Sequence, residues 1–181
     1  MDVLPALPPG KCITTLLAEA DRLGVDVRWK QQPESAEPSG TYTALPGKPG
    51  YVTLQAAEQQ DTDPRVCRLL AHEMVHVIQH WQANFVAVLP LGWPVDKSRL
   101  PRERVSTHEA EAFTAQWQPR RVIKALNELE PQRGLATSPS ITPIDRGRAA
   151  SQASQTTGSN TPGLIENVLS ISAARDSKPQ S

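Results

Sequence analysis

The sequence predicts an α+β domain at residues 1–131, followed by a disordered tail at 132–181. Three stretches have the apolar spacing of helices, and short segments that alternate apolar and polar residues lie between the first two. After "NELEPQRG" the chain becomes rich in Ser, Thr, Gln, Pro and Gly and contains no aromatic residue. Such a composition buries too little apolar surface to offset the entropy lost on ordering, so no packed structure is expected there.

The first half of the domain is predicted to contain one helix and about three strands. "CITTLLAEADRLG" (12–24) has apolar residues at helical spacing and ends at a glycine, as helices often do. "VDVRW" (25–29) alternates apolar and polar residues, and "TYTAL" and "YVTLQ" flank the turn "PGKPG" (46–50). We expect these strands to form a small sheet that packs against the helices.

The second half of the domain is predicted to contain two longer helices. Asp63 and Pro64 suit the N-cap and the first helical position, and apolar residues keep helical spacing from there to about residue 82. A last helix is expected at about 102–129, where Pro119 should kink it or divide it in two.

The helix that begins at Pro64 contains "LLAHEMVHVIQH", in which His72 and His76 are four residues apart and Glu73 follows the first histidine. Residues four apart on a helix differ by about 40° around the axis and about 6 Å along it, so both imidazoles can reach one metal ion. A zinc ion with three protein ligands keeps a water molecule whose pKa falls to about 7, and a neighbouring carboxylate can take its proton. The pattern therefore predicts metal-assisted hydrolysis of an amide, with Glu73 as general base.

Two carboxylates about 30 residues further on, Glu109 and Glu111, are the candidates for the third ligand. His80 continues the four-residue spacing, but a rise of about 12 Å from His72 carries it past the ion. Residues two apart on a helix point about 200° away from each other, so only one of the two glutamates can face the histidines. Glu109 is favoured because it lies on an apolar stripe, whereas the side of Glu111 looks solvated or lines the cleft; Glu111 remains the alternative and could support the ligands instead. The apolar stripe comprises Val105, Ala112, Phe113 and Trp117.

The chain resembles the small gluzincins, particularly the anti-repressor peptidases of the ImmA/IrrE type. The matching pieces are "SGTYTALPGKPGYVTLQ", "LLAHEMVHVIQH" and "EAEAFTAQ", within about residues 10–130. The resemblance implies a minimal zincin fold and a zinc-dependent peptidase, with one zinc ion held by His72, His76 and Glu109 and with Glu73 as the catalytic base. The chain departs from the family at Val75, where the family often has glycine, and it shows no helix-turn-helix, so cleavage of a repressor is not implied.

The resemblance also suggests how a substrate would be held. It assigns "YVTLQ" as the strand whose edge pairs with an extended peptide. The connection "NFVAVLPLGWP" (84–94) could wall the cleft with Phe85 and Trp93, or it could simply pack on the core. His108 is a candidate to stabilise the oxyanion, because donors aimed at developing charge contribute strongly to catalysis.

The two cysteines, Cys12 and Cys67, are 55 positions apart and form no metal-binding pattern. We expect both to be free and buried, because free cysteine is among the most buried residue types and because a reducing cytoplasm disfavours the alternative, a disulfide. The cytoplasm is expected because the start, "MDVLPALPPGK", does not have the pattern of a signal peptide.

Charge and hydropathy limit the partners that this chain is expected to have. The 19 basic and 19 acidic residues balance, so no nucleic acid or acidic membrane surface is expected as a partner. No apolar stretch approaches the roughly 20 residues that span a bilayer. In the tail, "LIENVLSISAAR" (164–175) has apolar residues spaced for a transient helix, either a fluctuating turn or a docking motif.

Two classes of function compete at this point. One is a zinc endopeptidase that acts on a protein or peptide. The other is a catalytically silent scaffold of the same fold that binds a protein partner. The presence of Glu73 favours the enzyme, because a binding module has no need of a general base.

Overall fold

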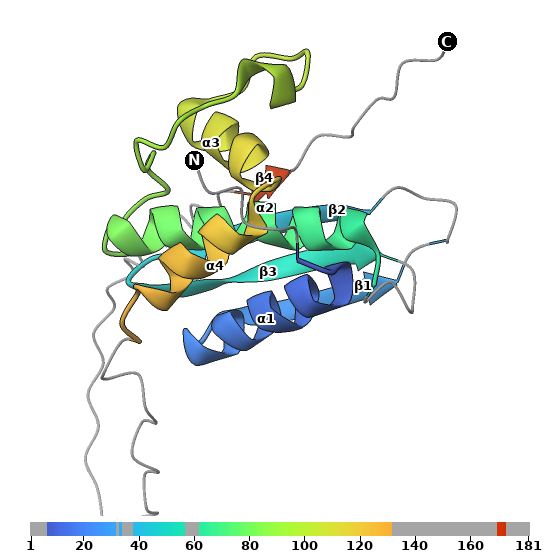
Figure 1. The fold of residues 1–181 in the computed structure, drawn as a ribbon. Helices are drawn as coiled ribbons and strands as arrows, with labels where there is room; N and C mark the ends of the chain where they lie inside the picture. The colour runs from blue at the N-terminus through green and yellow to red at the C-terminus, as the bar shows by residue number, and fades with distance from the viewer. Residues whose placement is uncertain (1–6, 32, 34–37, 57–61, 132–169, 173–181) are drawn as a thin grey trace, which may run out of the picture. The chain divides into compact units, whose positions relative to one another are not determined.

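The computed structural model describes residues 7–31, 33, 38–56, 62–131 and 170–172. Four helices and four strands lie in these ranges, with one short 3-10 helix (Figure 1). In chain order they are α1 (Pro9–Arg22), β1 (Asp26–Gln31), β2 (Ser39–Leu45), β3 (Lys48–Ala56), α2 (Pro64–Gln82), η1 (Lys97–Arg99), α3 (Thr107–Ala115), α4 (Pro119–Asn127) and β4 (Ser170–Ser172).

The sheet has the strand order β1-β3-β2-β4. The strand β3 is parallel to β1 and antiparallel to β2, and the short β4 is antiparallel to β2. The expectation that "YVTLQ" offers a free edge is wrong, because this segment lies in β3, and β1 and β2 flank it on both sides. The second strand of the hairpin pairs with β1, so β3 lies between β1 and β2.

The turn between β2 and β3 is tighter than the five residues expected. Leu45 pairs with Lys48, so the turn consists of Pro46 and Gly47 alone. Proline suits the first central position of a type II turn, and the second needs a positive φ, which Gly47 supplies at 72°. The Gly47 N–H donates to the carbonyl of Phe85, which ties the hairpin to the chain that leaves α2.

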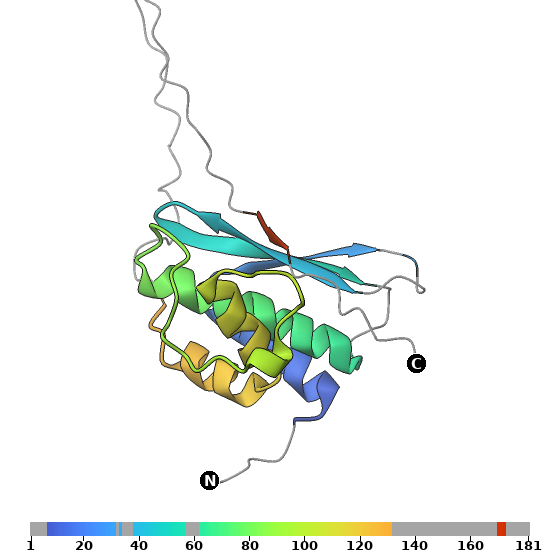
Figure 2. The ribbon, with the colours of Figure 1, turned by 90° about the horizontal axis from the view of Figure 1, so that it is seen from above.

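All four helices lie on one face of the sheet, as the view in Figure 2 shows. The helix α2 is central: it packs against β2 and β3 and also against α1, α3 and α4. Every residue from Leu69 to His80 is consequently buried, polar side chains included. The predicted metal-binding motif therefore lies inside the domain rather than on its surface.

The helix boundaries follow the predicted signals with small shifts. The helix α1 begins at Pro9, earlier than expected, with proline in its first turn, and the positive φ of Gly24 follows its end. Pro119 divides the predicted last helix into α3 and α4, because proline is well suited to the first turn of a new helix. The structure also begins α3 later than expected, after Ser106 at the N-cap position.

A disulfide joins Cys12 of α1 to Cys67 in the first turns of α2, with the two Cα atoms 5.9 Å apart. The expectation of two free thiols is wrong. Both cysteines are buried where α1 and α2 pack against each other, so each lies within bonding reach of the other. Because disulfides persist mainly in oxidising compartments, the bridge weighs against the cytoplasmic localisation, which stays a prediction.

Only residues 170–172 of the predicted tail are described, and they form β4 rather than part of a helix. The rest of 132–181, including most of the candidate docking motif at 164–175, lies outside the described residues. The predicted boundary at 131 and the predicted disorder therefore stay predictions. Among the helices in the described ranges, none combines the length and the apolar character needed to cross a membrane.

We predict that breaking the Cys12–Cys67 bridge destabilises the fold. A crosslink that closes a loop of 55 residues is worth roughly 4 kcal/mol through the entropy of the unfolded chain. Reduction of the native protein should therefore lower its unfolding midpoint in a denaturant titration. The double variant C12A/C67A supplies the control, since its midpoint should be low and should not respond to reductant. An equal response of both proteins to reductant would contradict the role of the bridge.

Candidate metal centre

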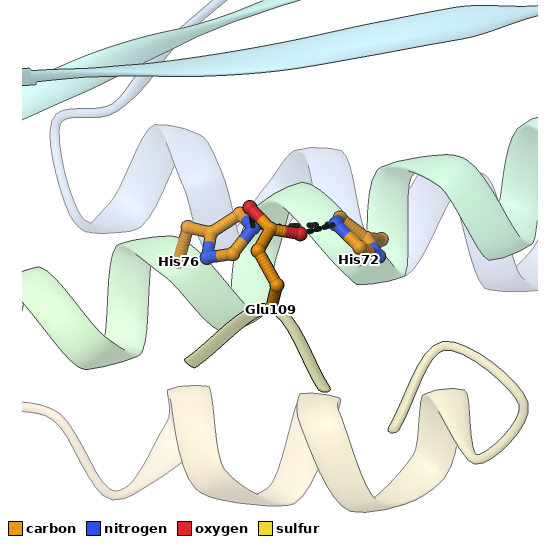
Figure 3. Close-up of side chains that lie close together, drawn as sticks. All are labelled: His72, His76 and Glu109. Carbon is orange, nitrogen blue, oxygen red and sulfur yellow. Dashed lines mark hydrogen bonds and ion pairs between the residues drawn. The ribbon is translucent and has the colours of Figure 1, made fainter. Parts of the chain in front are cut away.

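The helices α2 and α3 bring three potential metal ligands together. His72 and His76 lie one turn apart on α2, with their Nε2 atoms 3.2 Å from each other. Glu109 reaches from the first turn of α3 to the two imidazoles (Figure 3). Its Oε2 lies 3.3 Å from Nε2 of His72, and its Oε1 lies 3.4 Å from Nε2 of His76.

These separations suit a small cation. Ligands at roughly 2.0–2.1 Å from a tetrahedral zinc ion lie roughly 3.3–3.4 Å from one another. His72, His76 and Glu109 form the one cluster of at least three His, Cys, Asp or Glu residues, within the ranges that the structure describes, that is close enough to hold a metal. Neither Glu109 oxygen has a hydrogen-bond partner of good geometry, although both are buried. A buried carboxylate in this situation is stabilised by a cation, so the residues present fit a bound metal ion.

The structure turns Glu111 away from the histidines. Its Oε1 accepts a hydrogen bond from the Trp93 N–H, and its Oε2 accepts from the Leu91 N–H and from Nε2 of Gln79. The rotation between positions two apart on a helix explains why only Glu109 of the two glutamates reaches the histidines. Of the two alternatives stated for the side of Glu111, the solvated one is wrong: Glu111 is 1% exposed, and the connection between α2 and α3 donates two backbone hydrogen bonds to it.

Glu73 lies between α2 and β2 and is completely buried. A β-carbon added at Gly40 of β2 would lie 2.9 Å from Oε1 of Glu73, so a side chain at this position would displace the carboxylate. Neither oxygen of Glu73 has a hydrogen-bond partner of good geometry. Gly40 is the glycine of "SGTY", a segment that carries part of the family resemblance. Its close approach to Glu73 was not predicted from the sequence, because it depends on how the sheet packs on the helix.

Burial and mutual charge shift the pKa values of the cluster in opposite directions. Burial raises the pKa of Glu73 to about 8, and burial together with the neighbouring His76 lowers the pKa of His72 to about 4. Burial opposes ionisation of Glu109 too, but its close contacts with both histidines outweigh burial and lower its pKa to about 2. For His76, burial is outweighed by Glu109 and Glu73, which raise its pKa. The two carboxylates therefore hold protons over different pH ranges.

His108 lies beside the cluster but outside it. Its ring centroid is 6.0 Å from that of His76, and its side chain is half-buried. Burial, followed by the charge of His76, lowers its pKa. Ser106 Oγ lies 3.2 Å from both ring nitrogens of His108. The role of His108 in oxyanion stabilisation stays a prediction.

His80 faces the sheet instead of the cluster. Its Nδ1 lies 2.8 Å from the hydroxyl of Tyr42, and that hydroxyl accepts a hydrogen bond from the Gly50 N–H. The tautomer of His80 decides whether its Nδ1 donates to this hydroxyl or accepts from it. This buried pair links α2 to the β2–β3 hairpin, so His80 has a structural place in the core, as its position past the predicted ion suggested.

The connection between α2 and α3 packs on the core. Phe85, at a φ of 59°, is 3% exposed and contacts the rings of His80 and Trp81. Trp93 packs against the core and lies under the guanidinium of Arg121, which is 4.4 Å from its ring centroid. These contacts agree with the expectation that residues 84–94 pack on the core.

No model of a protein family, no curated protein and no solved structure matches this chain. The statements that the structure supports are thus an α+β fold and a cluster of His72, His76 and Glu109 able to hold a metal ion.

We predict that Glu73 makes the metal-free protein less stable as the pH rises. The pKa of Glu73 is about 8 in the folded protein, against 4.5 for an ordinary glutamate, so the folded state holds the extra proton between these values. That contribution to stability is complete below about pH 4.5 and is lost as the pH rises to about 8.

The measurement compares E73Q with the native protein by denaturant unfolding at pH 5 and at pH 8 with a chelator present. From pH 5 to pH 8, E73Q should gain up to about 4 kcal/mol relative to the native protein. The opposite pH trend expected from His72, whose pKa is lowered, is present in both proteins and cancels. Parallel pH profiles would contradict the burial of an uncompensated carboxyl group.

Proposed function

We propose that this protein is a zinc-dependent peptidase of the gluzincin kind, which hydrolyses peptide bonds in a protein or peptide substrate. The observation that carries the proposal is the convergence of His72, His76 and Glu109 at distances that suit a tetrahedral zinc ion. Glu73 is next to the first of these ligands in the chain, where a general base for the bound water is required.

The protein residues divide the work between them. His72, His76 and Glu109 would hold the metal and leave one position open, and a zinc ion there supplies a polarised carbonyl and a water of low pKa. Glu73 would take the proton of the attacking water on a carboxylate oxygen and later deliver it to the leaving amine. Packing of Glu73 between α2 and β2 excludes bulk water from the carboxyl group, which favours holding the proton during the reaction.

The second candidate is a metal-bearing scaffold that binds a protein without cutting it. The complete burial of Glu73 favours this alternative, because a general base must reach a water molecule. The two candidates share the metal site and differ in whether Glu73 affects turnover, so they can be separated experimentally.

We predict that the purified protein binds about one zinc ion per chain. Replacing any one of His72, His76 or Glu109 by alanine removes a ligand and should weaken zinc binding about 100-fold or more, as measured by competition with a chromophoric chelator. The matched control is His108→Ala, which removes a nearby imidazole outside the cluster and should leave the affinity within about twofold. Equal affinities in all variants would rule out the assigned ligands.

We predict that E73Q keeps its zinc and loses hydrolysis. Glutamine cannot accept the proton, so turnover of an unfolded protein such as denatured casein should fall by roughly 10²–10⁴-fold. The exposed substitution E103Q makes the same chemical change on the connection before α3 and should leave turnover unchanged. A native protein that binds zinc but cleaves nothing would favour the scaffold, and full activity of E73Q would show that the assigned base is wrong.

A further inference from the structure

Gln79 is a buried amide one turn beyond His76, and its role is not explained by the metal ligands alone. Its Oε1 lies 2.7 Å from Nδ1 of His76. Its Nε2 donates to the backbone carbonyl of His108 at 2.9 Å and to Oε2 of Glu111 at 3.1 Å. Gln79 is completely buried, so these contacts must satisfy it.

The partners of Gln79 fix which way its amide points. The carbonyl of His108 can only accept a hydrogen bond, and Glu111 already accepts from two backbone N–H groups, those of Leu91 and Trp93. The amide NH₂ must therefore face these acceptors, which leaves the amide oxygen facing His76.

The direction of the amide in turn fixes the tautomer of His76. An amide oxygen can only accept, so Nδ1 of His76 must carry the proton. The lone pair of a neutral His76 then lies on Nε2, the atom that faces Nε2 of His72 and Oε1 of Glu109. This is the tautomer that a metal ion in the cluster requires.

His72 lacks such an arrangement. Its Nδ1 is buried and has no hydrogen-bond partner of good geometry. The two histidines of the motif are therefore held differently. The orientation of His76 depends on Gln79, whose amide is in turn fixed by His108 and Glu111 of α3.

Glu111 also connects this arrangement to the chain between α2 and α3. Its hydrogen bonds to the Leu91 and Trp93 N–H groups fix the connection, and its bond to Gln79 fixes the amide. Thr114, one turn further along α3, makes a similar tie by accepting from the Asp96 N–H, but the atoms that it contacts do not include Gln79.

We propose that Gln79 and Glu111 are positioning residues that hold His76 in the tautomer competent to bind metal, with Glu111 orienting the amide and Gln79 orienting the imidazole. The proposal rests on the metal site put forward above. It predicts that the carboxylate of Glu111 couples the position of the 91–93 backbone to the metal affinity of His76.

The test uses the full chain with Gln79→Met, which keeps the length and helical preference of the side chain and removes both hydrogen-bonding groups. Zinc affinity should fall about 10–100-fold, the cost of losing a partner behind a metal-bound histidine. E111Q replaces one of the two acceptor oxygens of Glu111 by an NH₂ donor, which cannot accept from the N–H groups that surround it. It should also weaken zinc binding, and it provides the test if the Gln79 variant fails to fold. Thr114→Val is the control, because it cuts a tie between the same connection and α3 and should leave zinc affinity within about twofold.

A second readout is the tautomer of His76, measured from its ring ¹⁵N shifts at a pH where the imidazole is neutral, without metal. The native protein should show the proton on Nδ1, and the Gln79 and Glu111 variants should show a mixture. If zinc affinity and tautomer are unchanged in both variants, the proposal is overturned while the metal site stands. If the native protein binds no zinc, the proposed function fails, and the tautomer measurement alone decides whether Gln79 and Glu111 orient His76.

Discussion

The burial of polar side chains on α2 is the constraint on which the rest of this structure depends. His72, Glu73, His76 and Gln79 all lie inside the domain, and buried polar groups are costly unless they are paired. The fold meets this requirement from several directions. The helix α3 supplies two carboxylates, and β2 supplies a glycine where a side chain would collide with Glu73. What remains unpaired is concentrated at the cluster, where a cation would complete it.

Charge balance connects the cluster to its surroundings. A divalent cation held by two neutral histidines and Glu109 would keep one positive charge, and an ionised Glu73 beside it would bring the local sum to zero. The opposite pKa shifts of the two glutamates agree with this division, because Glu109 contacts both imidazoles whereas burial dominates at Glu73. Introducing a cation would stabilise the ionised form of Glu73.

Local patterns in the sequence predicted the elements and part of the site. Helical spacing and caps located α1 and α2, and Pro119 marked a real division between helices. The rotation between neighbouring helical positions allowed only one glutamate to face the histidines, and the structure places Glu109 there. Contacts between distant segments could not be read in this way. The bridge between Cys12 and Cys67, the central position of β3 and the burial of Glu111 all depend on how elements pack together.

The outer edge of the sheet is covered by a segment from near the far end of the chain. The strand β4 pairs with Thr41, Tyr42 and Thr43 of β2, so the backbone groups at this edge are not all left open. An open edge strand is a template for pairing between molecules, which leads to domain exchange and aggregation. The covered strand is also the one whose glycine lies against Glu73. Residues 170–172 therefore cover the edge of the same strand that lies beside Glu73.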